Sequence, residues 1–188
     1  MEVGLDERPV ALWVHGWNDD PTVGWFGWLT AKLEEKGYRV IAPHFEANAP
    51  HRFDRWRTEL VQLSAQFDQR TIIVAHSLGT WLTLRLVEDL KGAHVFAGIF
   101  LVSGFFDAPR PEAAKFFEPE PNWSVVLPAA RRWVAVYSDD DRIVTPDRTR
   151  RLAHKLQAEL VCIPGHGHFL GSRGMNELPE LLELIEGK

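Results

Sequence analysis

Residues 71–80 constrain the fold of this 188-residue chain more than any other stretch. They begin with an apolar, β-branched run of strand length and end in the sequence Ala-His-Ser-Leu-Gly-Thr. Apolar residues then recur at helical spacing, at Leu78, Trp81, Leu82 and Leu86. The pattern predicts a buried strand, a sharp turn at Ser77 and a helix. In such a turn the serine hydroxyl stands clear of both elements, and its neighbours must be small.

Ser77 is therefore a candidate nucleophile. The residues around it meet the pattern G-x-S-x-G, except that Ala75 stands in place of the first glycine. One extra methyl group is a mild departure, because both flanking positions stay small. The alternative interpretation is that Ser77 only caps the helix that follows. A five-residue match arises often by chance, so its meaning depends on chemistry elsewhere in the chain.

Strand-like and helix-like segments alternate along the whole chain, with no repeat and no linker. The predicted strands are residues 10–15, 38–42, 71–75, 95–102, 132–138 and 160–163. The predicted helices are residues 25–37, 56–67, 78–91, 145–156 and 178–185. This alternation requires crossover connections, which give a parallel sheet covered on both faces. We therefore expect one domain over residues 1–188, an α/β fold built as a three-layer α/β/α sandwich around a six-stranded parallel sheet, with the strand at 95–102 in a central position.

Residues 104–131 differ from the rest of the chain. They hold five of its twelve prolines, with phenylalanines and Trp123 between them. One short helix is expected there, near residues 111–117. Because it follows the fourth predicted strand, we expect this cap-like segment to lie over the turn at Ser77. One or two of Phe105, Phe106, Phe116, Phe117 and Trp123 are expected to reach a pocket there, with packing in the core as the alternative.

Composition and charge exclude several classes of partner. The net charge is -5, and the chain has no basic stripe of the kind that a nucleic-acid backbone requires. The longest apolar run, residues 93–106, is shorter than the roughly 20 residues of a membrane-spanning helix. Residues 1–8 are acidic and lack the apolar centre of a signal peptide. Cys162 is the only cysteine, and its apolar neighbours indicate that it is buried. We expect a cytoplasmic protein that binds neither nucleic acid nor membrane.

Two further clusters follow strands and could supply the partners that a serine nucleophile needs, a base and an acid that orients it. Asp139, Asp140 and Asp141 follow the fifth strand, and His166 and His168 follow the sixth. The carboxyl ends of parallel strands share one edge of the sheet, where reactive groups gather. The alternatives are a solvated aspartate turn and a metal site at the two histidines. No third metal ligand has a recognisable spacing, so we expect no metal and no cofactor.

The chain resembles the α/β-hydrolase superfamily, and within it the small serine hydrolases of the retinoblastoma-binding protein 9 and YdeN-like type. The segments that carry the resemblance span most of the chain: residues 24–29, 71–79, 101–103, 138–146 and 167–169. The order serine, aspartate, histidine along the chain is also that of α/β-hydrolases. The resemblance implies a sheet with the strand order 2-1-3-4-5-6.

The resemblance also implies roles for individual residues. Ser77 is the nucleophile, His168 the base and Asp141 the acid that orients it, with Asp140 as the alternative if the loop is shifted by one residue. The amides of Trp17 and Leu78 are expected to bind the oxyanion.

The expected substrate is a small molecule with an acyl group. The pocket candidates are His15, Phe105, Phe106, His166 and Phe169, although the two histidines could instead make loop hydrogen bonds and the aromatic residues could pack in the core. The implied function is hydrolysis of esters, thioesters or amides of small acyl groups. The alternative is a protein-interaction module on a hydrolase scaffold.

Overall fold

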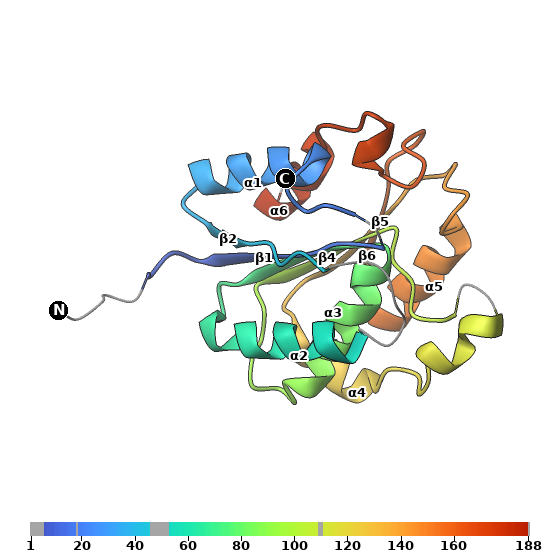
Figure 1. Ribbon diagram of the computed structural model, residues 1–188, viewed down its shortest axis with the longest axis horizontal. Coiled ribbons are helices and arrows are strands. Elements are labelled where there is room, and N and C mark those ends of the chain that lie inside the picture. The colour runs from blue at the N-terminus through green and yellow to red at the C-terminus, as the bar shows by residue number, and fades with distance from the viewer. Residues whose placement is uncertain (1–5, 18, 46–52, 109–110, 188) are drawn as a thin grey trace.

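The structure is a computed structural model that describes all residues except 1–5, 18, 46–52, 109–110 and 188. Six strands form one sheet in the order β2-β1-β3-β4-β5-β6, and each neighbouring pair is parallel (Figure 1). The strands are β1 (Val10–Val14), β2 (Arg39–Ile41), β3 (Ile72–His76), β4 (Gly98–Val102), β5 (Trp133–Tyr137) and β6 (Glu159–Cys162). The predicted fold class and strand order are confirmed.

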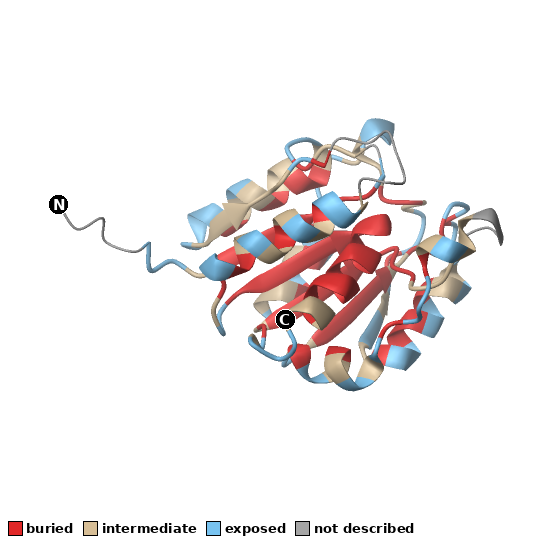
Figure 2. Cartoon of the chain, turned by 60° about the horizontal axis from the view of Figure 1, so that its bottom comes forward, coloured by how far each residue is buried: buried red, intermediate tan, exposed pale blue. Residues whose placement is uncertain are grey.

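Helices cover both faces of this sheet (Figure 1). They are α1 (Gly24–Glu35), α2 (Phe53–Leu63), α3 (Leu78–Asp89), α4 (Trp123–Val126), α5 (Pro146–Leu156) and α6 (Pro179–Glu186). α1 and α6 lie on one face, and α2, α3, α4 and α5 lie on the other. The sheet is therefore the middle of three layers, and Figure 2 shows its central strands buried between helices whose outer sides are exposed.

The alternation of side chains along the strands divides the core in two. Ala11 and Trp13 of β1 pack toward α1 and α6, whereas Leu12 and Val14 pack toward the opposite helices. Both faces of β1, β3 and β4 are fully buried, which explains why these strands read as unbroken apolar runs.

The segment between β4 and β5 holds more local structure than the sequence predicted. The expected short helix is a 3-10 segment at Pro111–Phe116. It is followed by α4, a single helical turn that was not predicted from the sequence. β4 also begins three residues later than expected, because Phe96 makes only an isolated bridge with Ala130. Residues 109–110 of the cap-like segment, like residues 1–5 of the acidic start, lie outside the described part of the chain.

Cys162 contradicts its predicted burial. β6 is an edge strand, and three of its four residues, Cys162 among them, are exposed. Apolar neighbours do not bury a side chain on a strand that lacks a partner on one side. No helix in the part of the chain that the structure describes is long and apolar enough to cross a bilayer.

Candidate active site

Ser77 occupies the sharp turn between β3 and α3. Its backbone has φ 52° and ψ -120°, a strained conformation for a residue with a side chain. The neighbouring strand β4 holds the turn in place, because the Ser77 amide donates a hydrogen bond to the Val102 carbonyl at 2.9 Å. Ser77 precedes α3, yet its side chain makes no capping hydrogen bond. The capping alternative is therefore wrong, and the hydroxyl is free for other chemistry.

Small residues make this turn possible. Gly79 packs against the end of β1, where a β-carbon on Gly79 would lie only 1.9 Å from the Val14 carbonyl oxygen. Gly16 is also in close contact, because its β-carbon would lie 3.0 Å from that of Ser77. The loop after β1 and the turn after β3 are thus in direct contact.

We expect Gly79→Ala to lower the free energy of unfolding by about 3 kcal/mol or more, because a backbone carbonyl cannot move aside as a flexible side chain can. Urea denaturation measures the change. Gly92→Ala is the matched control, since a β-carbon there meets nothing within 4 Å and only the positive φ of 81° opposes it. It should cost about 1 kcal/mol. Equal losses in the two variants would contradict the packing explanation.

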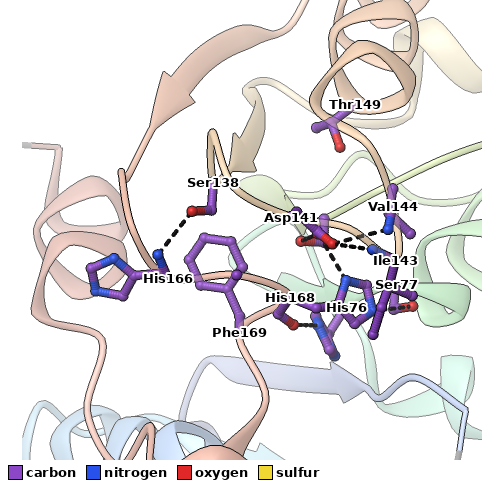
Figure 3. Close-up of polar contacts among 12 residues, drawn as sticks. His76, Ser77, Ser138, Asp141, Ile143, Val144, Thr149, His166, His168 and Phe169 are labelled. Atoms are coloured by element: carbon purple, nitrogen blue, oxygen red, sulfur yellow. Dashed lines mark hydrogen bonds and ion pairs between the residues drawn. The ribbon is translucent and has the colours of Figure 1, made fainter.

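The side chains of Ser77, His168 and Asp141 meet at the carboxyl edge of the sheet (Figure 3). Nε2 of His168 lies 3.0 Å from the Ser77 hydroxyl, and Nδ1 lies 2.8 Å from Oδ2 of Asp141. These residues follow β3, β5 and β6, so the parallel sheet brings together groups that are far apart in the sequence. An ionised carboxylate only accepts, so Nδ1 carries the ring proton and Nε2 is left to accept the serine proton.

The carboxylate of Asp141 is held by donors on both oxygens. Ser103, which directly follows β4, donates its hydroxyl proton to Oδ2 at 2.7 Å. The amides of Ile143 and Val144 donate to Oδ1 at 2.8 and 3.0 Å. Burial raises the pKa of Asp141, but its bonds to His168, Ser103 and the backbone outweigh burial and leave the pKa below its ordinary value. The group is therefore a fixed anion at neutral pH.

The pKa of His168 is also lowered. Burial is the largest cause, because the ring is only 8% exposed and water cannot solvate an imidazolium there. The hydrogen bond to Asp141 opposes this effect, and the electrostatic interaction with the neighbouring His76 adds to it. The ring is consequently neutral at neutral pH and ready to accept a proton.

The other two aspartates hold the loop that carries His168. Asp139 accepts the amide of Gly165 at 2.9 Å. Asp140 accepts the amide of Gly167 at 2.8 Å and the Ser138 hydroxyl at 2.6 Å. The aspartate cluster is therefore not merely a solvated turn, and the carboxylate on His168 belongs to Asp141 rather than to Asp140.

An apolar cavity of about 300 Å³ opens beside the Ser77 hydroxyl. Its lining residues are Trp17, Phe53, Ser77, Leu78, Phe105, Ala113, Phe116, Phe117, Ile143 and Val144. The cap-like segment supplies Phe105, Phe116 and Phe117, and none of the lining residues that the structure describes has a charged side chain. The sequence analysis did not predict that residues of α2 and of the loop after β5 line the cavity.

Of the predicted pocket residues, the structure places Phe105, Phe116 and Phe117 in this lining. Phe106 packs edge-on against Trp123 instead. Phe169 is completely buried in the core layer of α1, because its backbone, at φ 53°, turns away from the cavity and its carbonyl accepts the Trp25 indole N–H. The pocket prediction is therefore corrected for Phe106 and Phe169.

The two predicted pocket histidines also lie elsewhere. His15 is buried and bonds its own loop: its ring donates to the Gly16 carbonyl and accepts the Phe45 amide, both at 2.8 Å. His166 lines a separate surface hollow together with residues of the 170–177 loop and stacks on Phe169.

Trp17 and Leu78, the expected oxyanion donors, both border the cavity next to Ser77. Leu78 is the first residue of α3, where an amide N–H has no acceptor within the helix. Their role stays a prediction. Among the described residues, no group of three or more histidine, cysteine, aspartate or glutamate side chains is placed to hold a metal ion.

Comparison with known proteins finds relatives that match most of the chain. The sequence profile of the serine hydrolases matches residues 11–187. YdeN of Bacillus subtilis is 28% identical over 174 residues, which cover 92% of each chain. The serine hydrolase RBBP9 of Rattus norvegicus is 24% identical over 176 residues, or 92% of this chain and 90% of the relative.

Solved structures of other proteins share the fold of this chain. The structure of the B. subtilis ydeN gene product superposes with a TM-score of 0.87 at 27% identity and covers 95% of this chain and 97% of its own. A carboxylesterase structure from Nitrososphaera gargenis has a TM-score of 0.73 at 12% identity, with 97% and 90% coverage. The latter likeness concerns the fold alone.

Proposed function

Because the chain belongs to the serine hydrolase family, we propose that it hydrolyses carboxylic esters of small apolar acyl groups through Ser77, His168 and Asp141. One observation carries the proposal: an uninterrupted chain of contacts from the Ser77 hydroxyl through His168 to a buried carboxylate, beside an apolar cavity. No cofactor is needed for this chemistry.

The reaction proceeds through an acyl-enzyme. Ser77 attacks the ester carbonyl while Nε2 of His168 takes its proton, and Asp141 stabilises the imidazolium that forms. The amides of Trp17 and Leu78 bind the tetrahedral oxyanion. His168 then protonates the departing alcohol, and afterwards it activates the water that releases the acid and frees Ser77.

The cavity supports an apolar acyl group of limited size. Its volume of about 300 Å³ is at the lower end of the range of about 300–1,000 Å³ typical of small-molecule sites. Each methylene buried there contributes about 0.8 kcal/mol. We expect kcat/KM to rise about fourfold with each added methylene until the cavity is full, and then to fall.

Two measurements test the function. A fluorophosphonate probe is expected to label the protein, and peptide mapping is expected to place the label on Ser77. A series of p-nitrophenyl esters of increasing acyl length, with a matched acyl group that ends in a carboxylate, then tests the cavity. The charged ester should be a poor substrate, because the described part of the cavity lining offers no basic side chain. A folded protein that resists the probe and every ester would instead favour the non-catalytic scaffold, with thioesters and amides as the substrates still to be tried.

The activity should depend on pH through His168. The base must be unprotonated, and burial lowers its pKa below the ordinary 6.5. We therefore expect kcat/KM to be low in acid, to rise with a midpoint below 6.5 and to be level at neutral pH. Initial rates between about pH 5 and 8 measure the profile. A flat profile, or a midpoint above 7, would contradict an imidazole base in this environment.

A further inference from the structure

A second histidine–aspartate pair lies directly behind the candidate triad. His76 precedes Ser77 at the end of β3, and its ring is 1% exposed. Nδ1 of His76 lies 3.0 Å from Oδ2 of Asp19, in the loop after β1. Nε2 lies 2.9 Å from the backbone oxygen of His168 (Figure 3). His76 therefore joins the loop after β1 to the loop that carries the candidate base.

The partners of His76 determine its charge. A carbonyl oxygen can only accept a hydrogen bond, so Nε2 of His76 carries a proton. Burial raises the pKa of Asp19, but its interactions with His76 and its hydrogen bond from the Asp20 amide outweigh burial and leave that pKa lowered, so Asp19 is an anion. An anion also only accepts, so Nδ1 of His76 carries a proton as well.

Two other buried histidines make the contrast clear. The ring of His15 faces one acceptor, the Gly16 carbonyl, and one donor, the Phe45 amide. The ring of His168 likewise faces one acceptor and one donor, Asp141 and the Ser77 hydroxyl. Both are satisfied as neutral rings, whereas His76 faces two acceptors and is satisfied only as an imidazolium.

We propose that His76 and Asp19 form a buried ion pair that positions His168: the doubly protonated ring holds the main chain of His168 and places a fixed positive charge beside its imidazole. The two ring centroids are 4.9 Å apart. Neither residue touches the reacting atoms, so both are positioning residues. Their catalytic consequence depends on the proposed function, whereas their charge state does not.

Every charged or titratable group around His168 enters this balance. Asp141 stands at Nδ1 and favours the protonated ring, and Asp19 does so more weakly from behind His76. His76 opposes protonation. His15 affects the pair through its electrostatic interaction with Asp19. The Trp25 and Phe26 rings of α1 make edge-type contacts with the His76 ring and carry no charge. His76 is thus the positive charge that keeps His168 a free base near neutral pH.

The charge state is tested on the wild-type protein, without any substrate. Nitrogen-15 NMR of histidine-labelled protein at pH 7 reports the protonation of each ring nitrogen, and the spectrum of His76→Gln identifies the His76 signals by their loss. We expect both nitrogens of His76 to be protonated and His168 to carry a proton on Nδ1 only. An unprotonated Nδ1 on His76 would overturn the proposal, whether or not the protein hydrolyses esters.

The catalytic consequence is tested with two substitutions of His76. Glutamine keeps an N–H donor near the Nε2 position but removes the charge, so we expect the midpoint of the kcat/KM profile to move up by about one pH unit, with less than a tenfold loss on the plateau. Leucine removes the donor as well, and its plateau should fall more than tenfold. The rate of fluorophosphonate labelling of Ser77 against pH provides the same profile independently of any ester.

Asp20→Asn is the control, because Asp20 is the neighbouring acid and its side chain bonds only within its own turn, to Thr22. It should leave the profile unchanged. A His76→Gln midpoint equal to that of the wild type would overturn the electrostatic role. If the His76 variants do not fold, sequential backbone-to-ring NMR assignment of the wild-type protein identifies the His76 signals, and that spectrum alone decides.

Discussion

Ser77→Ala is expected to lower kcat for ester hydrolysis by between about 10⁴- and 10⁶-fold. The substitution removes the atom that forms the acyl-enzyme, and no second hydroxyl can take its place: Ser103, the nearby buried serine, donates to Asp141 on the far side of His168. KM should change little, because the methyl group leaves the apolar cavity intact. Steady-state rates at saturating ester measure the effect.

The fold of this variant should persist, since alanine keeps the β-carbon that packs against Gly16. Ser124→Ala, on the exposed surface of α4, is the matched control and should retain full activity. A Ser77→Ala protein that kept more than about one hundredth of the wild-type kcat would rule out Ser77 as the nucleophile.

Asp141→Asn is expected to lower kcat by about 10⁴-fold without unfolding the protein. The amides of Ile143 and Val144 require an acceptor at the Oδ1 position, so the asparagine oxygen turns toward them. Its NH₂ group then faces Nδ1 of His168, which must give up its proton. The remaining ring proton moves to Nε2, the atom that should accept the proton of Ser77.

Asp140→Asn is the matched control for this tautomer effect. Asp140 uses one oxygen to accept from both Ser138 and Gly167, and an amide oxygen can do the same. We expect less than about a tenfold loss in kcat. If both asparagine variants lost activity equally, the aspartates would act by holding the loop and not by setting the tautomer of His168.

The fold was predictable because its signals are local and periodic. Apolar runs on β1, β3 and β4 indicate strands buried on both faces, and the polar and glycine-rich breaks between segments mark the turns. The exposure of Cys162 was not predictable in this way. Burial on β6 depends on its position at the edge of the sheet, which no property of its four residues encodes.

The candidate site was predictable where chemistry and strand ends coincide. Ser77, Asp141 and His168 each follow a strand, and the structure brings their side chains together. Ser103 also directly follows a strand that neighbours the strand before Ser77, so its position in the sequence is itself a signal for its contact with Asp141.

Other parts of the site follow only from tertiary packing. In the sequence Asp19 has the pattern of an ordinary turn residue, and its contact with His76 is visible only in the structure. Phe169 adjoins a predicted site residue, and only its positive φ shows that the chain turns there into the core.

Part of the cavity wall comes from a segment of the chain that carries no triad residue. Phe105, Phe116 and Phe117 lie in the segment between β4 and β5, whereas the groups that carry out the proposed chemistry follow β3, β5 and β6. Mutation can therefore change which acyl groups are accepted without disturbing bond cleavage. Homologous enzymes can therefore diverge in the substrates that they accept while they retain the same catalytic residues.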